Sequence, residues 1–238
     1  HVEGNTFAGG AGDGVTVRRG EVVRNEIRNY GGAGISATDS GYGPPVLLYN
    51  NVHDNGKGIS GKQMRGYWNR LSNDVPYEAV ATSSSGNDLR RNCWESLIGE
   101  MTSYPKNISG IDDIEDDRAL GRVDYNLWLP YRPVDGTCAE PWPTGPESRF
   151  VWPANEMTMS RNALRIEGTA YAPNGIQVVE VSTDNGLTWL PATGAYYWTF
   201  DFTPPAAETY RLKSRVTEVG GPLPVTDPTH DVTFTVSD

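Results

Sequence analysis

The residues best suited to chemistry in this sequence lie in its first third. Asp39, Asp54, Lys57 and Arg65, with His53 beside Asp54, combine carboxylates with cationic side chains. Cleavage of an acidic sugar chain needs two or three carboxylates, for calcium or acid–base work, near an Arg or Lys that meets the substrate's acid group. None of these five recurs at a regular spacing that would build a facing pair. We expect them on turns of adjacent rungs, with Asp54 and Lys57 as ordinary turn residues, and assign no catalytic residue.

Metal and cofactor chemistry has few candidate ligands. The three histidines, at 1, 53 and 230, are widely spread, and neither Cys93 nor Cys138 belongs to a C-x-x-C pair. A zinc or haem site needs such ligands in clusters. The acidic run 112–117 lacks the alternating Asp and Gly spacing of a calcium loop, so we expect a short helix with a solvated acidic face. The sequence predicts no metal and no cofactor.

Composition narrows the class of partner. The chain has 238 residues and a formal net charge of −10, which disfavours nucleic acid because phosphates demand clustered Lys and Arg. No stretch has the length of a transmembrane helix, so membrane insertion is not expected. With 27 Gly and 17 Pro, the chain suits many short strands joined by turns.

A repeat in the first half indicates how these residues are positioned. The segments 22–35 and 47–59 share an Asn, an apolar residue two positions later, a Gly-rich turn and Gly-Ile. A period near 20 residues with a strand inside it predicts a β-solenoid in which equivalent side chains stack. A leucine-rich repeat has a similar period, but its Leu-rich consensus is missing. We expect two internal columns, Asn5, Asn25, Asn50, Asn69, Asn87 and Phe7, Ile27, Val52, Leu71, Leu89. A second apolar series is expected at Val15, Ile35, Ile59 and Val80.

These rungs resemble the right-handed parallel β-helix repeat family over about the first 95 residues. The next segment is similar to the closing segment of bacterial secreted β-helix proteins. The matching residues are Asn92, Trp94, Ile111, Asp112, Asp116, Asp117, Val123, Asp124, Tyr125, Trp128 and Leu129. Large aromatic side chains here, Trp94, Tyr104, Tyr125 and Trp128, would cover the open strand edge. Cys93 and Leu127 depart from the family pattern. A disulfide from Cys93 to Cys138 would tie the cap to the following linker, and two buried free thiols are the alternative.

The second half changes character. Five prolines within 130–146 predict a stiff connector,. Alternating strands separated by turns follow, which is typical of a β-sandwich. The segment 210–216 resembles the penultimate strand of bacterial immunoglobulin-like domains, with Tyr210 at the place of a tyrosine corner. We expect β-helix rungs and cap over 1–129, a linker over 130–147 and an immunoglobulin-like sandwich over 148–238.

The second half of the chain contains one specific sequence motif. Residues 182–189 match the Asp-box pattern S-x-D-x-G-x-T-W, which shapes a hairpin turn in sialidase-like propellers and is not catalytic there. It occurs once, so we expect a hairpin turn with Trp189 on the core.

Two functions follow as hypotheses for this all-β chain. The first is a non-catalytic, exported structural or surface module, extracellular, which assembles into a homo-oligomer, fibre or adhesive appendage through the N-terminal β-helix edge. The second is a fragment of a polysaccharide lyase or glycoside hydrolase that binds an extracellular acidic polysaccharide. The first residue is His1, so we expect that an upstream segment is missing. The triplet Asn107-Ile108-Ser109 permits a glycan.

Overall fold

The computed structural model contains two compact units, His1–Trp142 and Pro143–Asp238. It describes residues 1–38, 41, 43–72, 74–83, 85–94, 97, 108–113, 116–117, 119–125, 131–132, 137–138, 143–222, 224 and 230–238, without side chains at 131–132 and 137–138. The chain is nearly all β, as expected. The break between the units falls within the expected linker.

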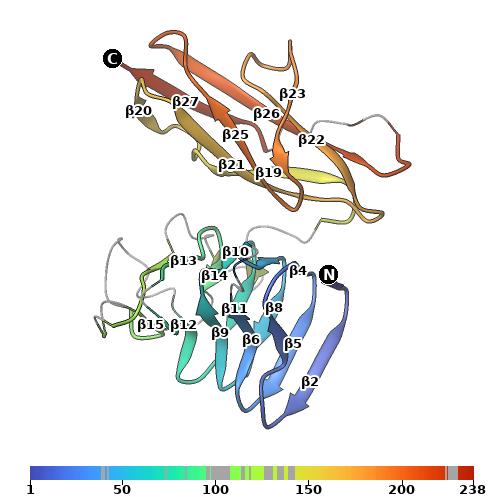
Figure 1. The fold of residues 1–238 in the computed structure, drawn as a ribbon, viewed down its shortest axis with the longest axis vertical. Coiled ribbons are helices and arrows are strands. Elements are labelled where there is room, and N and C mark those ends of the chain that lie inside the picture. Colours follow the sequence, from blue (N-terminus) through green and yellow to red (C-terminus); the bar gives the residue numbers. More distant parts are fainter. Residues whose placement is uncertain are drawn as a thin grey trace. The chain divides into compact units, whose positions relative to one another are not determined.

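The first unit is a parallel β-solenoid of about four turns. Each turn adds one strand to each of three parallel sheets, so neighbours within a sheet are three strands apart in sequence (Figure 1). Sheet 1 holds β1 (Val2–Glu3), β4 (Glu21–Val23), β7 (Val46–Leu48), β10 (Arg65–Tyr67), β13 (Asn87–Asp88) and β16 (Val123–Asp124). Sheet 2 holds β2 (Thr6–Gly10), β5 (Glu26–Tyr30), β8 (Asn51–His53), β11 (Arg70–Ser72) and β14 (Cys93–Trp94). Sheet 3 holds β3 (Val15–Val17), β6 (Ala33–Thr38), β9 (Lys57–Lys62), β12 (Tyr77–Ala81) and β15 (Ile111–Asp112).

The apolar column of sheet 2 follows the repeat with one correction. Register pairs Phe7 with Ile27, Ile27 with Val52 and Val52 with Leu71. Its last member is Trp94, which pairs with Leu71. Leu89 is buried in the same core but follows β13, so its assignment to this column is wrong.

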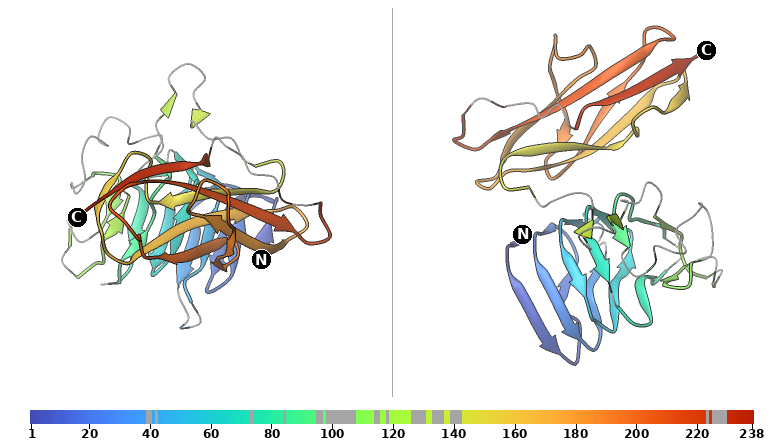
Figure 2. Two further views of the ribbon diagram at one scale, coloured as in Figure 1. Left: turned by 90° about the horizontal axis from the view of Figure 1, so that it is seen from above. Right: turned by 180° about the vertical axis from the view of Figure 1, so that it is seen from behind.

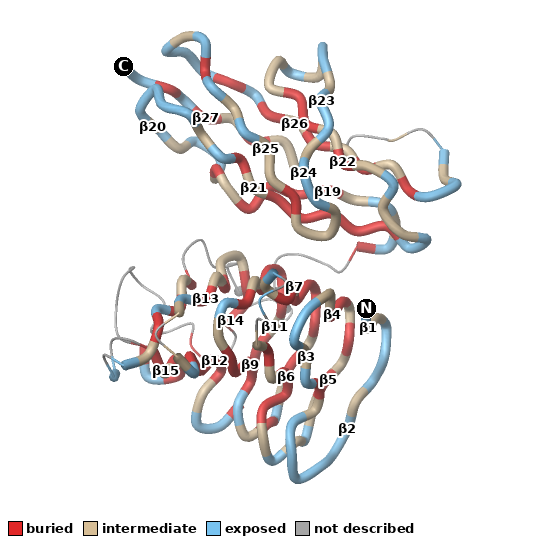
Figure 3. The backbone as a smooth tube through the Cα atoms, viewed as in Figure 1, coloured by how far each residue is buried: buried red, intermediate tan, exposed pale blue. Residues whose placement is uncertain are grey.

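The apolar column of sheet 3 needs a similar correction. Val15, Ile35 and Ile59 align, and the next member is Ala79 instead of Val80. Because strand side chains alternate between faces, a shift of one residue moves a side chain out of the column. Figure 3 shows buried residues on β6, β9 and β12.

The end of the solenoid is filled by large side chains. Trp94 and Tyr125 are 2% and 3% exposed and pack in the core with Leu97, Ile108 and Ile111. This confirms the expected burial of both aromatic plugs. Tyr104, Trp128 and Leu129 lie outside the described residues, as do Leu127, Glu115, Asn107 and Asp39.

The acidic run differs from the expected solvated helix. Ile111–Asp112 is strand β15, and Asp116 and Asp117 donate backbone N–H groups to the carbonyl oxygen of Asp113 in a turn. Asp113 is buried, and its carboxylate accepts the N–H of Val123 over 2.9 Å. A solvated face is therefore wrong for Asp113, because its carboxylate completes the backbone hydrogen bonds of the cap.

The second unit is a β-sandwich of two sheets (Figure 2). One sheet has the order β19 (Glu147–Trp152), β21 (Leu164–Tyr171), β25 (Tyr197–Phe202), β24 (Thr193–Gly194). The other has the order β20 (Thr158–Ser160), β27 (Val232–Ser237), β26 (Thr209–Glu218), β22 (Ile176–Ser182), β23 (Leu190–Pro191). A separate hairpin of β17 (Tyr131–Arg132) and β18 (Thr137–Cys138) precedes it along the chain. Trp198 is fully buried in this core, edge-on to Phe150 at a ring distance of 5.4 Å.

Candidate functional site

A ladder of buried asparagines runs along the solenoid. From the second member onward, the Oδ1 atom of each Asn accepts both the backbone N–H and the side-chain Nδ2–H of the Asn one coil earlier, over 2.8–3.3 Å. The members are Asn5, Asn25, Asn50, Asn69 and Asn92. The last four are each 0% exposed, so these bonds form away from water and hold the coils in register.

Asn87 does not belong to this ladder, which corrects the sequence prediction. Its Oδ1 accepts the N–H of Met64 and its Nδ2 donates to the Gly61 carbonyl, at a different corner of the coil. Both Asn87 and Asn92 precede an apolar residue by two positions, so the motif alone fits either one. The discriminating signal is Trp94, because the column of sheet 2 ends on it and not on Leu89.

The corner before each ladder Asn has left-handed backbone. The preceding residue has φ between 55° and 67° in every coil, namely Gly4, Arg24, Tyr49, Trp68 and Arg91. Four of the five are not glycine, although side chains disfavour this region. Fixed hydrogen bonds on the following Asn therefore determine the corner, and the corner turns the chain from sheet 1 into sheet 2.

Asn5, in the first coil, is the first member of the ladder within the sequence given. Asn5 donates to Asn25, but none of the described residues donates to the Oδ1 atom of Asn5. β1, β2 and β3 each lie at the edge of their sheet. Phe7 and Val17 on these strands are only partly buried.

A second, shorter ladder lies at the corner after sheet 2. Asn55 Oδ1 accepts the N–H of Tyr30, and Asn55 donates its own N–H and Nδ2–H to Asp74 Oδ1 over 2.7 and 2.9 Å. Asp74 and Glu78 are 4% and 1% exposed. Burial raises the pKa of Asp74 to about 6, against the hydrogen bonds from Asn55 and Glu78, which lower it,.

His53 lies on strand β8 and not on the expected turn, between two carboxylates on the outer face of sheet 2. Its Nε2 is 2.8 Å from Glu26 Oε1, and its Nδ1 is 2.6 Å from Asp54 Oδ2. Burial lowers the pKa of His53, but the hydrogen bonds to Glu26 and Asp54 outweigh it, and the net pKa is raised. For Glu26, burial raises the pKa, and the hydrogen bonds with His53 and Asn51 reverse this to a net lowering. The arrangement favours the protonated form of His53, which can form ion pairs with Glu26 and Asp54.

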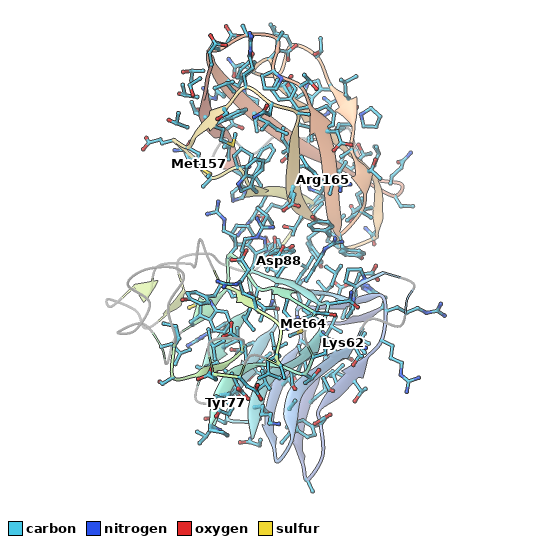
Figure 4. All side chains as sticks on the ribbon, turned by 60° about the vertical axis from the view of Figure 1, so that its left-hand side comes forward. Lys62, Met64, Tyr77, Asp88, Met157 and Arg165 are labelled. Carbon is cyan, nitrogen blue, oxygen red and sulfur yellow. The ribbon has the colours of Figure 1, made fainter. Side chains whose placement is uncertain are left out.

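The other charged candidates lie on different sheets. Lys57 begins β9 in sheet 3, and Arg65 begins β10 in sheet 1, in register with Asp88. Arg90 donates two hydrogen bonds to the Asp88 carboxylate, at 2.8 and 2.7 Å (Figure 4 labels Asp88). The structure thus brings together His53 and Asp54 but not Lys57 or Arg65, and Asp39 is outside the described residues.

The cap contains a disulfide-bonded cysteine, Cys93, which is 1% exposed. Among the described residues no cysteine is free. The chain has one other cysteine, Cys138, whose side chain lies outside the described part. No group of three or more potential metal ligands occurs among the described residues, and in the same set no helix is long and apolar enough to cross a membrane.

The Asp-box segment of the sandwich forms a compact turn after β22. Asp184 accepts the Oγ–H of Ser182 at 2.7 Å and the N–H and Oγ1–H of Thr188 at 2.9 and 2.5 Å. The Thr188 hydrogen bonds, with a smaller one from Ser182, lower the pKa of Asp184 to about 2. Trp189 is half-buried and stacks on the guanidinium of Arg215, 4.2 Å from the ring centre. A shallow cavity of about 380 Å³ adjoins this turn, lined by Asp184, Phe202, Glu208 and Arg211 among others.

Comparison with known proteins assigns no family to this chain. No family model matches the chain, and no curated protein matches it. Fibronectin(III)-like modules of CbhA from Clostridium thermocellum are 20% identical, over 37% of this chain and 93% of that chain, with a TM-score of 0.32. A modular endo-beta-1,4-mannanase from Cellulomonas fimi is 12% identical, over 74% of this chain and 40% of that chain, with a TM-score of 0.29. An engineered protein is 22% identical, over 40% of this chain and 21% of that chain, with a TM-score of 0.31.

Proposed function

We propose that this chain is a non-catalytic structural module of an exported, extracellular or cell-surface protein. In this proposal the solenoid is a right-handed β-helix of the bacterial secreted type, and the sandwich is an immunoglobulin-like spacer. The tyrosine corner supports the second part: the hydroxyl of Tyr210 donates to the Ala206 carbonyl over 2.9 Å and accepts the Ala206 N–H over 3.1 Å,.

The single observation that carries the proposal is the unsatisfied first coil. The backbone groups of the edge strands β1, β2 and β3 can pair with a further strand. The Oδ1 atom of Asn5 can accept hydrogen bonds, as Asn25 Oδ1 does from Asn5. A bare parallel edge is a template for pairing. The opposite end is filled by Trp94 and Tyr125. Such an edge is either continued by upstream sequence or covered by another chain. Our proposal is the second of these, in which a second copy of the chain covers the first coil in a homo-oligomer.

The charged outer face supports a structural role over catalysis. Both ring nitrogens of His53 are bound to carboxylates, so this histidine has no free nitrogen to act as a general base. Lys57 and Arg65, which would meet an acid group of a sugar, stand on two other sheets. A lyase or hydrolase activity therefore remains the second candidate.

Assembly is tested by sedimentation and light scattering over a wide concentration range, with electron microscopy of the largest species. We expect concentration-dependent oligomers for the wild type. Ala8 is exposed on edge strand β2, and Ala8→Lys should suppress assembly because a lysine on an edge blocks pairing. Ala8→Ser is the matched control and should assemble. A wild type that stays monomeric at every concentration would exclude self-assembly.

Catalysis is tested separately by incubating the protein with polyuronides and following unsaturated or reducing ends. We expect no product. Product formation that Ala8→Lys leaves intact would overturn the non-catalytic assignment and favour the second candidate.

A further inference from the structure

The two sequence motifs of the sandwich, the Asp-box turn and the tyrosine corner, line the same cavity. Residues 183–185 of the turn line this cavity of about 380 Å³, and so do residues of the segment 202–211, which contains the corner. All of these residues belong to the second unit. The cavity is therefore independent of the first coil and of any assembly through it.

Hydrogen bonds fix both of these segments. Asp184 accepts three hydrogen bonds within its turn, two of them from Thr188. The N–H of Asn185 donates to the carbonyl oxygen of Arg211 over 3.2 Å, which joins the turn to β26. The two corner hydrogen bonds of Tyr210 fix the loop that precedes it. A ligand would meet walls that are already formed, so little binding free energy is lost in ordering them.

Three polar side chains in this cavity have groups open to a ligand. Thr183, Asn185 and Glu208 make no side-chain hydrogen bond or ion pair with any other residue that the structure describes. Phe202 and Pro205 add apolar surface to the same cavity. Hydroxyl, amide and carboxylate groups beside an aromatic ring suit a pyranose, whose hydroxyls need hydrogen-bond partners and whose C–H face packs on a ring.

The charge of the cavity selects among sugars. Two carboxylates, of Asp184 and Glu208, line it against one guanidinium, of Arg211. Arg211 is already bound to Asp231, over 2.8 and 3.1 Å. The hydrogen bonds from Thr188 lower the pKa of Asp184 to about 2, so this carboxylate is ionised at neutral pH. The cavity therefore repels a uronate and favours an uncharged sugar.

A metal ion fits this cavity poorly. Both carboxylate oxygens of Asp184 already accept hydrogen bonds within the turn, which leaves Glu208 as the one open carboxylate in the cavity. A hard cation takes six or more oxygen ligands. Within the described part of the chain, no three acids, histidines or cysteines come together to hold one.

We propose that this cavity binds one neutral pyranose unit of a glycan. Thr183, Asn185 and Glu208 bond its hydroxyls, and the ring of Phe202 packs against its C–H face. The sandwich then carries a glycan-binding site in addition to the structural role proposed for the chain.

The test is saturation-transfer difference NMR of the full chain with neutral tetrasaccharides of glucose, mannose, xylose and galactose, and with trigalacturonate as the acidic probe. We expect at least one neutral probe to bind, and trigalacturonate to bind about tenfold more weakly or not at all. Glu208→Ala should weaken binding of that neutral probe about tenfold, because hydrogen bonds to a charged group are lost. Asn185→Gly should weaken it about fivefold, since it removes a neutral amide.

The variants have matched controls. Circular dichroism should show the wild-type fold for both, because glycine suits the φ of 60° at position 185 and Glu208 is exposed. Gln177→Ala removes an exposed amide on β22 outside the cavity and should bind as the wild type does. Ala8→Lys should also bind normally, which separates this site from assembly. Three results would overturn the proposal: no binding of any neutral probe, equal affinities for Glu208→Ala and Gln177→Ala, or tighter binding of trigalacturonate than of every neutral probe.

Discussion

Asn69 donates its side-chain N–H to the Oδ1 of Asn92 over 3.0 Å, while its own Oδ1 accepts two hydrogen bonds from Asn50. The amide thereby ties three consecutive coils together at one corner. Because Asn69 is 0% exposed, water cannot replace these bonds when the side chain is lost.

Asn69→Ala should destabilise the solenoid strongly. It orphans two donors of Asn50 and the Leu47 carbonyl, and each buried orphan costs about 1–3 kcal/mol. We expect a loss of about 3 kcal/mol or more in the free energy of unfolding, measured by urea titration. Asn51→Ala is the control, since Asn51 is half-buried on the outer face and its side chain donates to Glu26 over 2.9 Å. A cost below about 1 kcal/mol for Asn69→Ala would contradict the ladder's role.

The sequence predicted this ladder because its physical requirement is local. An Asn, an apolar residue two positions later and a turn every 20 or so residues are enough to specify a stack of coils. Asn5, Asn25, Asn50 and Asn69 follow that pattern, and the structure aligns all four. At the cap the coil lengths change, two Asn residues compete for one position, and only the three-dimensional register selects Asn92.

The interior acids were not predictable in the same way. Asp74 and Glu78 are polar residues near a turn, and single polar residues there are normally solvated. Their burial depends on the corner geometry set by Asn55 one coil earlier. The pairing of His53 with Glu26 similarly joins residues 27 positions apart, which no local motif encodes.

Gly168→Ala should disrupt the sandwich. A Cβ atom at Gly168 would lie 2.0 Å from Trp198 Cζ2 and 2.5 Å from the Arg149 carbonyl oxygen. Overpacking of a rigid core costs about 1–3 kcal/mol or more, and this indole is fully buried. Gly145→Ala is the matched control, because nothing lies within 4 Å of a Cβ atom there. Tryptophan fluorescence during denaturation should show earlier unfolding for Gly168→Ala alone. Equal midpoints for the two variants would contradict the packing.

His53 should titrate above its ordinary pKa of 6.5. Since the folded-state pKa is raised, the stabilisation is fully present below 6.5 and is lost as pH rises through the folded value,. Proton NMR of the His53 ring checks the direction. Glu26→Gln removes one carboxylate and should lower the pKa of His53 toward 6.5. An unchanged titration in Glu26→Gln would show that Glu26 does not hold the charge.

Tyr210→Phe tests the corner of the sandwich. The hydroxyl joins Ala206 through two hydrogen bonds, at 2.9 and 3.1 Å, while the ring stacks on Phe234 and meets Phe202 edge-on. Removing the hydroxyl alone keeps the ring contacts, so we expect a loss of about 1–2 kcal/mol in the free energy of unfolding of this unit. Tyr210→Leu removes the ring as well and should cost about 2 kcal/mol more, because aromatic pairs and buried area are lost together. If Tyr210→Phe matched the wild type, the backbone of the loop at Ala206 would be held by strands β25 and β26 alone, and the corner hydrogen bonds would have no part in fixing the sandwich.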